Sequence, residues 1–106
     1  LVGNWNNMAK QSDCRLVILA HNPDALTVMP EKSCSILLCG HTHGGQVYMP
    51  FNIEFTLLRH DSLPKKGYKY GMLEYKKNKV YITCGLGCSF LPIRFMTAAE
   101  IAYIYL

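Results

Sequence analysis

The sequence lacks the features of membrane-spanning proteins, of repeat proteins and of chains with two domains. No apolar run reaches the roughly 18 residues that a membrane-spanning helix needs, and no signal peptide opens the chain. There is no internal repeat, no low-complexity tract and no linker that would divide two domains. The 106 residues are 50% hydrophobic and only 17% charged, which excludes a disordered chain and allows one small domain over residues 1–106. The first residue is Leu1 rather than Met, so we expect a fragment, a processed product or the ordered part of a longer protein.

Acidic residues are also scarce, with 7 Asp and Glu against 11 Lys and Arg and a formal net charge of +4. Much of the excess positive charge lies in one region, in Lys65, Lys66, Lys69, Lys76, Lys77 and Lys79. These lysines suit an anionic partner such as a phosphate, a nucleic acid or a lipid surface. They also suit a solvated hairpin whose charges protect a sheet edge. No helix-turn-helix pattern or base-stacking motif accompanies them, so we favour the hairpin and expect no nucleic-acid partner.

The cysteine count is odd, with thiols at Cys14, Cys34, Cys39, Cys84 and Cys88. An odd count, mostly within apolar runs, predicts reduced thiols and a cytoplasmic location. Cys84 and Cys88 are conceivable metal ligands, but no second pair at ligand spacing accompanies them. A buried structural role is therefore the favoured interpretation.

Two apolar runs predict strands that each end at a histidine. Residues 16–20 precede His21, and residues 35–39 precede Gly40 and His41. Continuous apolar runs are typical of strands buried on both faces. Because the C-terminal ends of such strands meet at one edge of an open sheet, we expect His21, His41 and His43 to converge there.

The rest of the chain predicts short elements. Polar residues 3–12 and residues 25–29, which follow an Asn-Pro-Asp helix start, predict two short helices. Residues 46–66 are irregular, and long loops of this kind are often functional. Two β-propensity runs predict a β-hairpin around the turn Lys76-Lys77-Asn78, and residues 101–106, apolar at every position, predict a final buried strand.

The pair His41 and His43, flanked by glycines, is the most distinctive feature. In extended backbone both rings would point to the same side, whereas in a tight loop they would diverge enough to serve two adjacent metals. Imidazole nitrogens suit zinc, manganese, iron or nickel. Gly44 and Gly45 permit positive φ and close approach of the backbone to a ligand. Together with His21, the pair favours a metal site over ordinary core or surface histidines.

The segment Gly40-His41-Thr42-His43-Gly44-Gly45-Gln46 resembles the last signature motif of the calcineurin-like metallophosphoesterases. Ala20-His21-Asn22-Pro23-Asp24 resembles the preceding histidine motif, in the form used by bacterial membrane-associated phosphoesterases. Further matching residues in the tail are Tyr68, Gly71, Tyr81, Gly85-Leu86-Gly87, Pro92, Arg94 and Glu100. The resemblance covers residues 15–106. It implies an α+β fold, the C-terminal portion of a four-layer αββα sandwich, with mainly β strands and one or two short helices.

The resemblance also implies roles for individual residues. His21 and His41 would bind one metal and His43 the other, with His41 and His43 acting in catalysis. The substrate would meet Gly44, Gly45 and Arg94, although a salt-bridged structural role is an equally weighted alternative for Arg94. Two divalent ions (Mn, Fe, Zn or Mg) would hold a bridging hydroxide that hydrolyses a phosphoester, phosphodiester or pyrophosphate. His60 matches no ligand position of the family.

The family's Asp-x-His motif, bridging Asp and Asn-His pair are absent from the sequence. We therefore expect the N-terminal half of the same domain to be a required partner and the 106-residue chain to be inactive alone. The alternative is a non-catalytic metal-site remnant or an interaction module.

Relatives with this His-Asn-Pro-Asp form include enzymes that cleave UDP-2,3-diacylglucosamine in lipid A synthesis. The lysines and an apolar loop, with Met49, Phe51, Ile53 and Phe55, would suit an anionic lipid, although ordinary packing of that loop is slightly favoured. The expected substrate is a phosphorylated small molecule or a lipid-linked one, met in the cytoplasm or at the inner face of the membrane.

Overall fold

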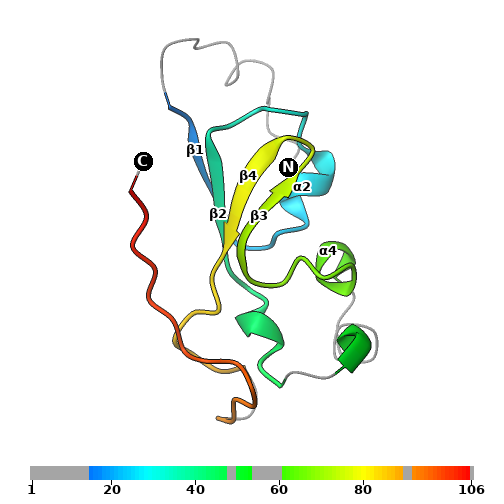
Figure 1. Cartoon of the computed structure of the whole chain (residues 1–106), viewed down its shortest axis with the longest axis vertical. Coiled ribbons are helices and arrows are strands. Elements are labelled where there is room, and N and C mark those ends of the chain that lie inside the picture. The colour runs from blue at the N-terminus through cyan, green and yellow to red at the C-terminus, as the bar shows by residue number, and fades with distance from the viewer. Residues whose placement is uncertain (1–14, 48–49, 54–60, 90–91, 106) are drawn as a thin grey trace.

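The computed structural model describes residues 15–47, 50–53, 61–89 and 92–105 (Figure 1). The described elements are β1 (Val17–Ala20), α2 (Ala25–Val28), β2 (Ile36–Cys39), the 3₁₀ turns η1 (His43–Gly45) and η2 (Pro50–Asn52), α4 (Ser62–Lys65), β3 (Gly71–Tyr75) and β4 (Asn78–Ile82). One sheet contains these four strands in the order β1-β2-β4-β3. This small mixed sheet with two short helices confirms the predicted α+β fold.

Three of the four strands run parallel and end at the same edge. β1 pairs with β2 in register Ala20↔Cys39, and β2 pairs with β4 in register Cys39↔Ile82. Both apolar runs therefore form the strands that the sequence predicts. The parallel pairing of β4 with β2, which the sequence did not indicate, also brings the chain after Ile82 to that edge, where the Thr83 N–H donates to the Cys39 carbonyl at 2.8 Å.

The predicted hairpin is confirmed as the antiparallel pair β3 and β4. Its turn residues Lys76 and Lys77 have φ of 48° and 58°, which is the left-handed conformation that a two-residue hairpin turn requires. Asn78 begins β4 and is fully buried. Its side-chain oxygen accepts from the Ser33 N–H at 2.7 Å, and its amide donates to the Pro30 carbonyl at 2.9 Å. Asn78 thus ties the hairpin to the loop that enters β2.

The hydrophobic core lies on one face of the sheet. It contains Ile18, Leu26, Met29, Leu37, Cys39, Leu63, Val80 and Ile82. Because side chains alternate along a strand, residues two apart on β2 and β4 share this face. Leu26 from α2 and Leu63 from α4, each with no exposed surface, cover it.

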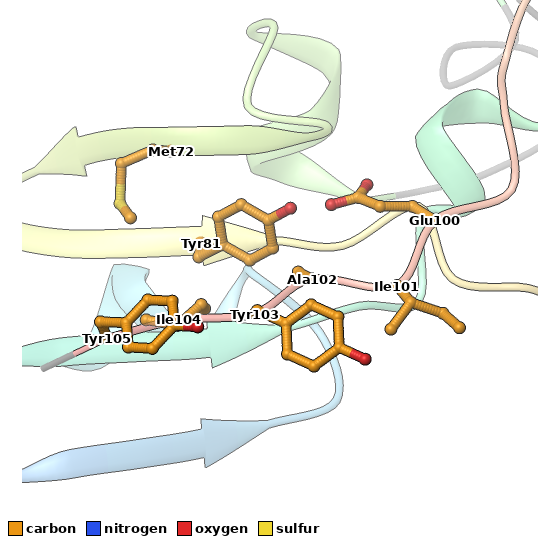
Figure 2. Close-up of a pocket in the computed structure, with 8 residues that line it drawn as sticks. All are labelled: Met72, Tyr81, Glu100, Ile101, Ala102, Tyr103, Ile104 and Tyr105. Carbon is orange, nitrogen blue, oxygen red and sulfur yellow. The ribbon is translucent and has the colours of Figure 1, made fainter.

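The opposite face carries the C-terminal segment, residues 101–105 (red in Figure 1), and it is only thinly covered. An open pocket of about 390 Å³ lies between this segment and the side chains of Met72, Tyr81 and Glu100 (Figure 2). Leu19 on this face is 78% exposed. The prediction that residues 16–20 are buried on both faces is therefore wrong for the chain as described.

The predicted final buried strand is also wrong over residues 101–105. The segment has no strand structure, and Ile101, Tyr103 and Tyr105 are 68%, 85% and 94% exposed. The physical reason is that this segment is outermost and no described layer lies over it. Only Ile104 is partly buried, and the other four residues of 101–105 are exposed.

Several other expectations concern the loops. Within residues 46–66, predicted to be irregular, the structure has the helical turn α4, which Asp61 precedes and which contains Pro64 in its first turn.

The predicted helix at residues 3–12 lies outside the described residues, as do Cys14, Met49, Phe55 and His60. No helix in the described ranges is long and apolar enough to cross a membrane.

Candidate functional site

His21 and His41 meet at the carboxyl edge of the parallel strands. His21 directly follows β1, and His41 follows β2 after Gly40, whose N–H donates to the His21 carbonyl at 3.1 Å and so holds the two strand ends together. The ring centroids lie 4.6 Å apart with an interplanar angle of 59°. The predicted convergence of these two histidines is what the register of β1 and β2 produces.

A carboxylate that the sequence did not indicate, Asp61, joins this pair. Its Oδ1 lies 3.4 Å from His41 Nε2 and accepts a hydrogen bond from the Asn22 amide at 2.9 Å. Asp61 precedes α4 without capping it with its side chain. Asp24 caps that helix instead, accepting from the Ser62 and Leu63 N–H groups at 2.7 Å each. The Asp-Ser-Leu-Pro sequence signals a helix start, but no sequence pattern indicates the contact with His41.

The loop between the two motif histidines is a tight turn and not extended backbone. His41, His43 and Gln46 have φ of 70°, 51° and 54°, and Gly44 has 63°. The fully buried Thr42 anchors this turn, because its hydroxyl donates to the Lys69 carbonyl at 2.6 Å and accepts from the Gly44 N–H at 3.3 Å. The diverging arrangement of the two rings is therefore the one that this backbone favours.

His43 turns toward a second loop, which follows β4. Its Nδ1 lies 3.0 Å from the Gly87 carbonyl oxygen. A carbonyl only accepts hydrogen bonds, so Nδ1 carries the hydrogen and, in the neutral ring, Nε2 has the lone pair. Metal-binding histidines commonly hold a backbone carbonyl in this way.

Gln46 fastens the same second loop at its far end. Its side-chain oxygen accepts from the Ser89 N–H at 2.7 Å, and its amide donates to the Ser89 carbonyl at 3.0 Å. At the near end, the Glu100 carboxylate accepts from the Cys84 N–H at 3.1 Å. The histidine motif and the residues around Gly87 therefore form one connected unit, which the sequence alone did not reveal.

Arg94 hydrogen-bonds backbone carbonyls within this unit. Its guanidinium donates to the carbonyls of Cys84, Gly85 and Gly87 at 2.8, 3.0 and 2.6 Å, and to that of Ala98 at 3.1 Å. Among the described residues these carbonyls take the place of the carboxylate that a salt bridge would supply. Contact of Arg94, Gly44 and Gly45 with a substrate stays a prediction.

The cysteines near the site have different environments. Burial raises the pKa of the Cys39 thiol to about 12. Burial also raises the pKa of Cys84, which the nearby Arg94 charge partly offsets. Cys88 is exposed, so the interpretation of a buried structural role is wrong for this residue. All four cysteines in the described ranges are unpaired thiols.

Several proteins with similar sequences are called metallophosphoesterases or phosphodiesterases. The chain is 34% identical over 85 residues to the metallophosphoesterase YkuE of Bacillus subtilis, covering 80% of this chain and 28% of YkuE. It is 35% identical over 79 residues to the phosphodiesterase YaeI of Escherichia coli, covering 74% of this chain and 28% of YaeI. The chain belongs to the metallophosphoesterase superfamily. A Helicobacter pylori metallophosphoesterase is 32% identical over 92 residues, which cover 85% of this chain and 23% of the relative. No family model and no solved structure matches the sequence.

The chain spans about a quarter of the length of these metallophosphoesterases. The family implies divalent metal ions, and the imidazoles and carboxylate at the edge of β1 and β2 are suitable donors. In the described part of the chain, however, no three His, Cys, Asp or Glu side chains lie together in a way that could hold an ion. The donor chemistry fits a metal, and the described residues provide only part of a coordination sphere.

Proposed function

We propose that this protein is a metal-dependent hydrolase of phosphoester, phosphodiester or pyrophosphate bonds. His21, His41 and His43 are its nitrogen ligands to two divalent ions. The observation that carries the proposal is the contact between the rings of His21 and His41, whose centroids lie 4.6 Å apart. This contact lies at the edge of the sheet where parallel strands place ligand sites. The names of the metallophosphoesterase and phosphodiesterase relatives support it.

The residues of the chain have separate tasks in this proposal. Divalent ions, when bound, activate water and neutralise charge on phosphoryl oxygens. The register of β1 and β2 holds His21 and His41 side by side, and the Gly87 carbonyl leaves Nε2 of His43 available as the ligand atom. Gly44 and Gly45 have no side chains and positive φ, so phosphoryl oxygens can approach their backbone.

The test is metal content and turnover in the full protein. We expect bound divalent metal by elemental analysis and Mn²⁺-dependent hydrolysis of bis-p-nitrophenyl phosphate. Substitution of His21, His41 or His43 by Asn should lower metal binding and turnover. The loss should exceed the roughly 10- to 100-fold that is typical when a residue hydrogen-bonded to a metal ligand is changed. His60→Asn, which changes the fourth histidine of the chain, is the matched control. Normal activity in all three ligand variants would refute the assignment.

A non-catalytic metal-site remnant or interaction module is the second candidate. It is favoured by one observation, the absence of a three-ligand group among the described residues. Metal stoichiometry separates the two, because a hydrolase of this class needs two ions. One ion or none per full-length protein, together with no turnover, would establish the remnant.

The proposed substrate is a phosphorylated molecule with a lipid portion, met at the inner face of a membrane. Phe51 is 91% exposed and Ile53 is 37% exposed, although packing of this loop was the slightly favoured expectation. Exposed lysines Lys65 and Lys66 close α4 and would attract anionic headgroups. Phe51→Asp should weaken binding of the full protein to anionic phosphatidylglycerol vesicles, whereas Tyr70→Asp, at another exposed aromatic residue, should not. Equal binding of both variants would exclude this surface. Cleavage of UDP-2,3-diacylglucosamine stays a prediction of the resemblance.

A further inference from the structure

One carbonyl oxygen, that of Gly87, accepts from two side chains that lie far apart in the sequence. Arg94 donates to it through Nη2 at 2.6 Å, and His43 donates through Nδ1 at 3.0 Å. The carbonyls of Cys84 and Gly85 also lie within hydrogen-bond distance of this Nη2, so its two N–H groups are shared among three acceptors. Three carbonyls of one short loop thus point at a single guanidinium.

That convergence depends on the positive charge. Carbonyl dipoles that point their negative ends at one another repel, and a cation between them reverses the sign of the interaction. The planar guanidinium has donors in fixed directions, so it orients several acceptors at once, which a lysine ammonium on a flexible stem does less well. Apart from Arg94, no described residue makes a further hydrogen bond that would hold the Gly87 carbonyl toward His43.

We propose that Arg94 is a positioning residue that acts through the Gly87 carbonyl to fix the ring of His43 with its hydrogen on Nδ1 and its lone pair on Nε2. The consequence for metal binding rests on the proposed function. The tautomer itself does not, because it belongs to the protein without metal. In this proposal the guanidinium acts on the ligand and not on the substrate.

The loop should keep its fold when Arg94 is replaced, since other contacts anchor both of its ends. Gln46 holds Ser89 through three hydrogen bonds. Glu100 holds the near end, its carboxylate accepting from Cys84 and its N–H donating to the Gly85 carbonyl at 3.0 Å. The expected effect of losing Arg94 is therefore local, at Gly87 and His43.

The experiment measures the His43 tautomer in the metal-free full protein by long-range ¹H–¹⁵N correlation at about pH 8, above the pKa of about 6.5 of a free imidazole. His43→Asn assigns the signals. We expect the Nδ1–H tautomer in the parent protein, a shift toward Nε2–H in Arg94→Ala, and a partial shift in Arg94→Lys. Mn²⁺ affinity, measured by calorimetry, should fall about 10- to 100-fold in Arg94→Ala.

Arg15→Ala is the control, because it removes the same charge from an exposed residue next to the opposite end of β1. It should change neither the tautomer nor the affinity. An Nε2–H tautomer in the parent protein, or an unchanged tautomer in a folded Arg94→Ala variant, would overturn the proposal. If Arg94→Ala does not fold, an unchanged tautomer in Arg94→Lys decides against it. A shifted tautomer in a protein that binds no metal would uphold the positioning and refute the proposed function.

Discussion

Replacing Gly44 by Ala is the sharpest test of how tightly the histidine loop is packed against the loop after β4. A Cβ at Gly44 would lie 2.8 Å from the Cys84 Sγ and 3.4 Å from the Thr97 Cγ2. Gly44 also has φ of +63°, a conformation that strains any L side chain. The substitution therefore carries two separate costs, one from the backbone and one from the contact.

A second glycine separates these costs. Gly85 has φ of +64°, and a Cβ there would meet nothing within 4 Å. Gly85→Ala should therefore show the backbone cost alone, about 1–2 kcal/mol. Gly44→Ala should show that cost and about 1–3 kcal/mol more for overpacking against Cys84. Adding Cys84→Ala to Gly44→Ala should recover most of the difference.

The assay is urea unfolding of the full protein for each single variant and for the double variant, followed by circular dichroism. The thermal midpoint, which falls as the free energy of unfolding falls, gives an independent measurement. The packing argument fails if Gly44→Ala and Gly85→Ala destabilise the protein equally. It also fails if Cys84→Ala gives no favourable coupling with Gly44→Ala in the double-mutant cycle.

Three further predictions follow from buried groups and from the composition of the site. Asn78→Ala should lower the free energy of unfolding by about 2–4 kcal/mol, because it leaves the Ser33 N–H and the Pro30 carbonyl unpaired, whereas Lys79→Ala should stay within about 0.5 kcal/mol in the same urea titration. Burial in the folded protein raises the pKa of Cys39 from 9.0 to about 12. Its neutral thiol therefore stabilises the fold below pH 9, and this stability is lost as the pH rises toward 12. Cys39→Ala should show a smaller decline in the free energy of unfolding over that range, and an identical decline would contradict the raised pKa. The purified 106-residue chain should not hydrolyse bis-p-nitrophenyl phosphate with Mn²⁺, and measurable turnover would show that it contains a complete site.

The strands and the first histidine pair could be predicted because they depend on local pattern. The apolar runs before His21 and His41 specify parallel strands, and parallel strands bring their ends together. Asp61 could not be found in this way. Two residues far earlier in the chain place it beside His41: Asp24, 37 positions earlier, caps the helix that Asp61 precedes, and the Asn22 amide donates to the Asp61 carboxylate. Contacts of this kind depend on tertiary placement and leave no periodic signal in the sequence.

The C-terminal segment shows what an apolar run cannot predict. An apolar run predicts burial only when a second layer is available, and periodicity says nothing about that layer. Residues 101–105 have the composition of a buried strand, but all of them except Ile104 are exposed because nothing in the described chain lies over them. The prediction was wrong about the covering layer and not about the apolar pattern. Composition alone therefore cannot distinguish an inner strand from an outer segment.

The strained backbone of the histidine motif has its own physical argument. His41, His43 and Gln46 all have positive φ, which costs of order 1–3 kcal/mol per residue unless the surroundings fix it. The surroundings here are specific: the Thr42 hydroxyl bonds the Lys69 carbonyl, the Gln46 amide bonds Ser89, and His43 bonds Gly87. A loop that needed only to connect β2 to the next element could avoid this strain with Gly or Asn at those positions. Strain retained at two histidines and held by specific hydrogen bonds is the expected property of side chains that must be oriented before a ligand arrives.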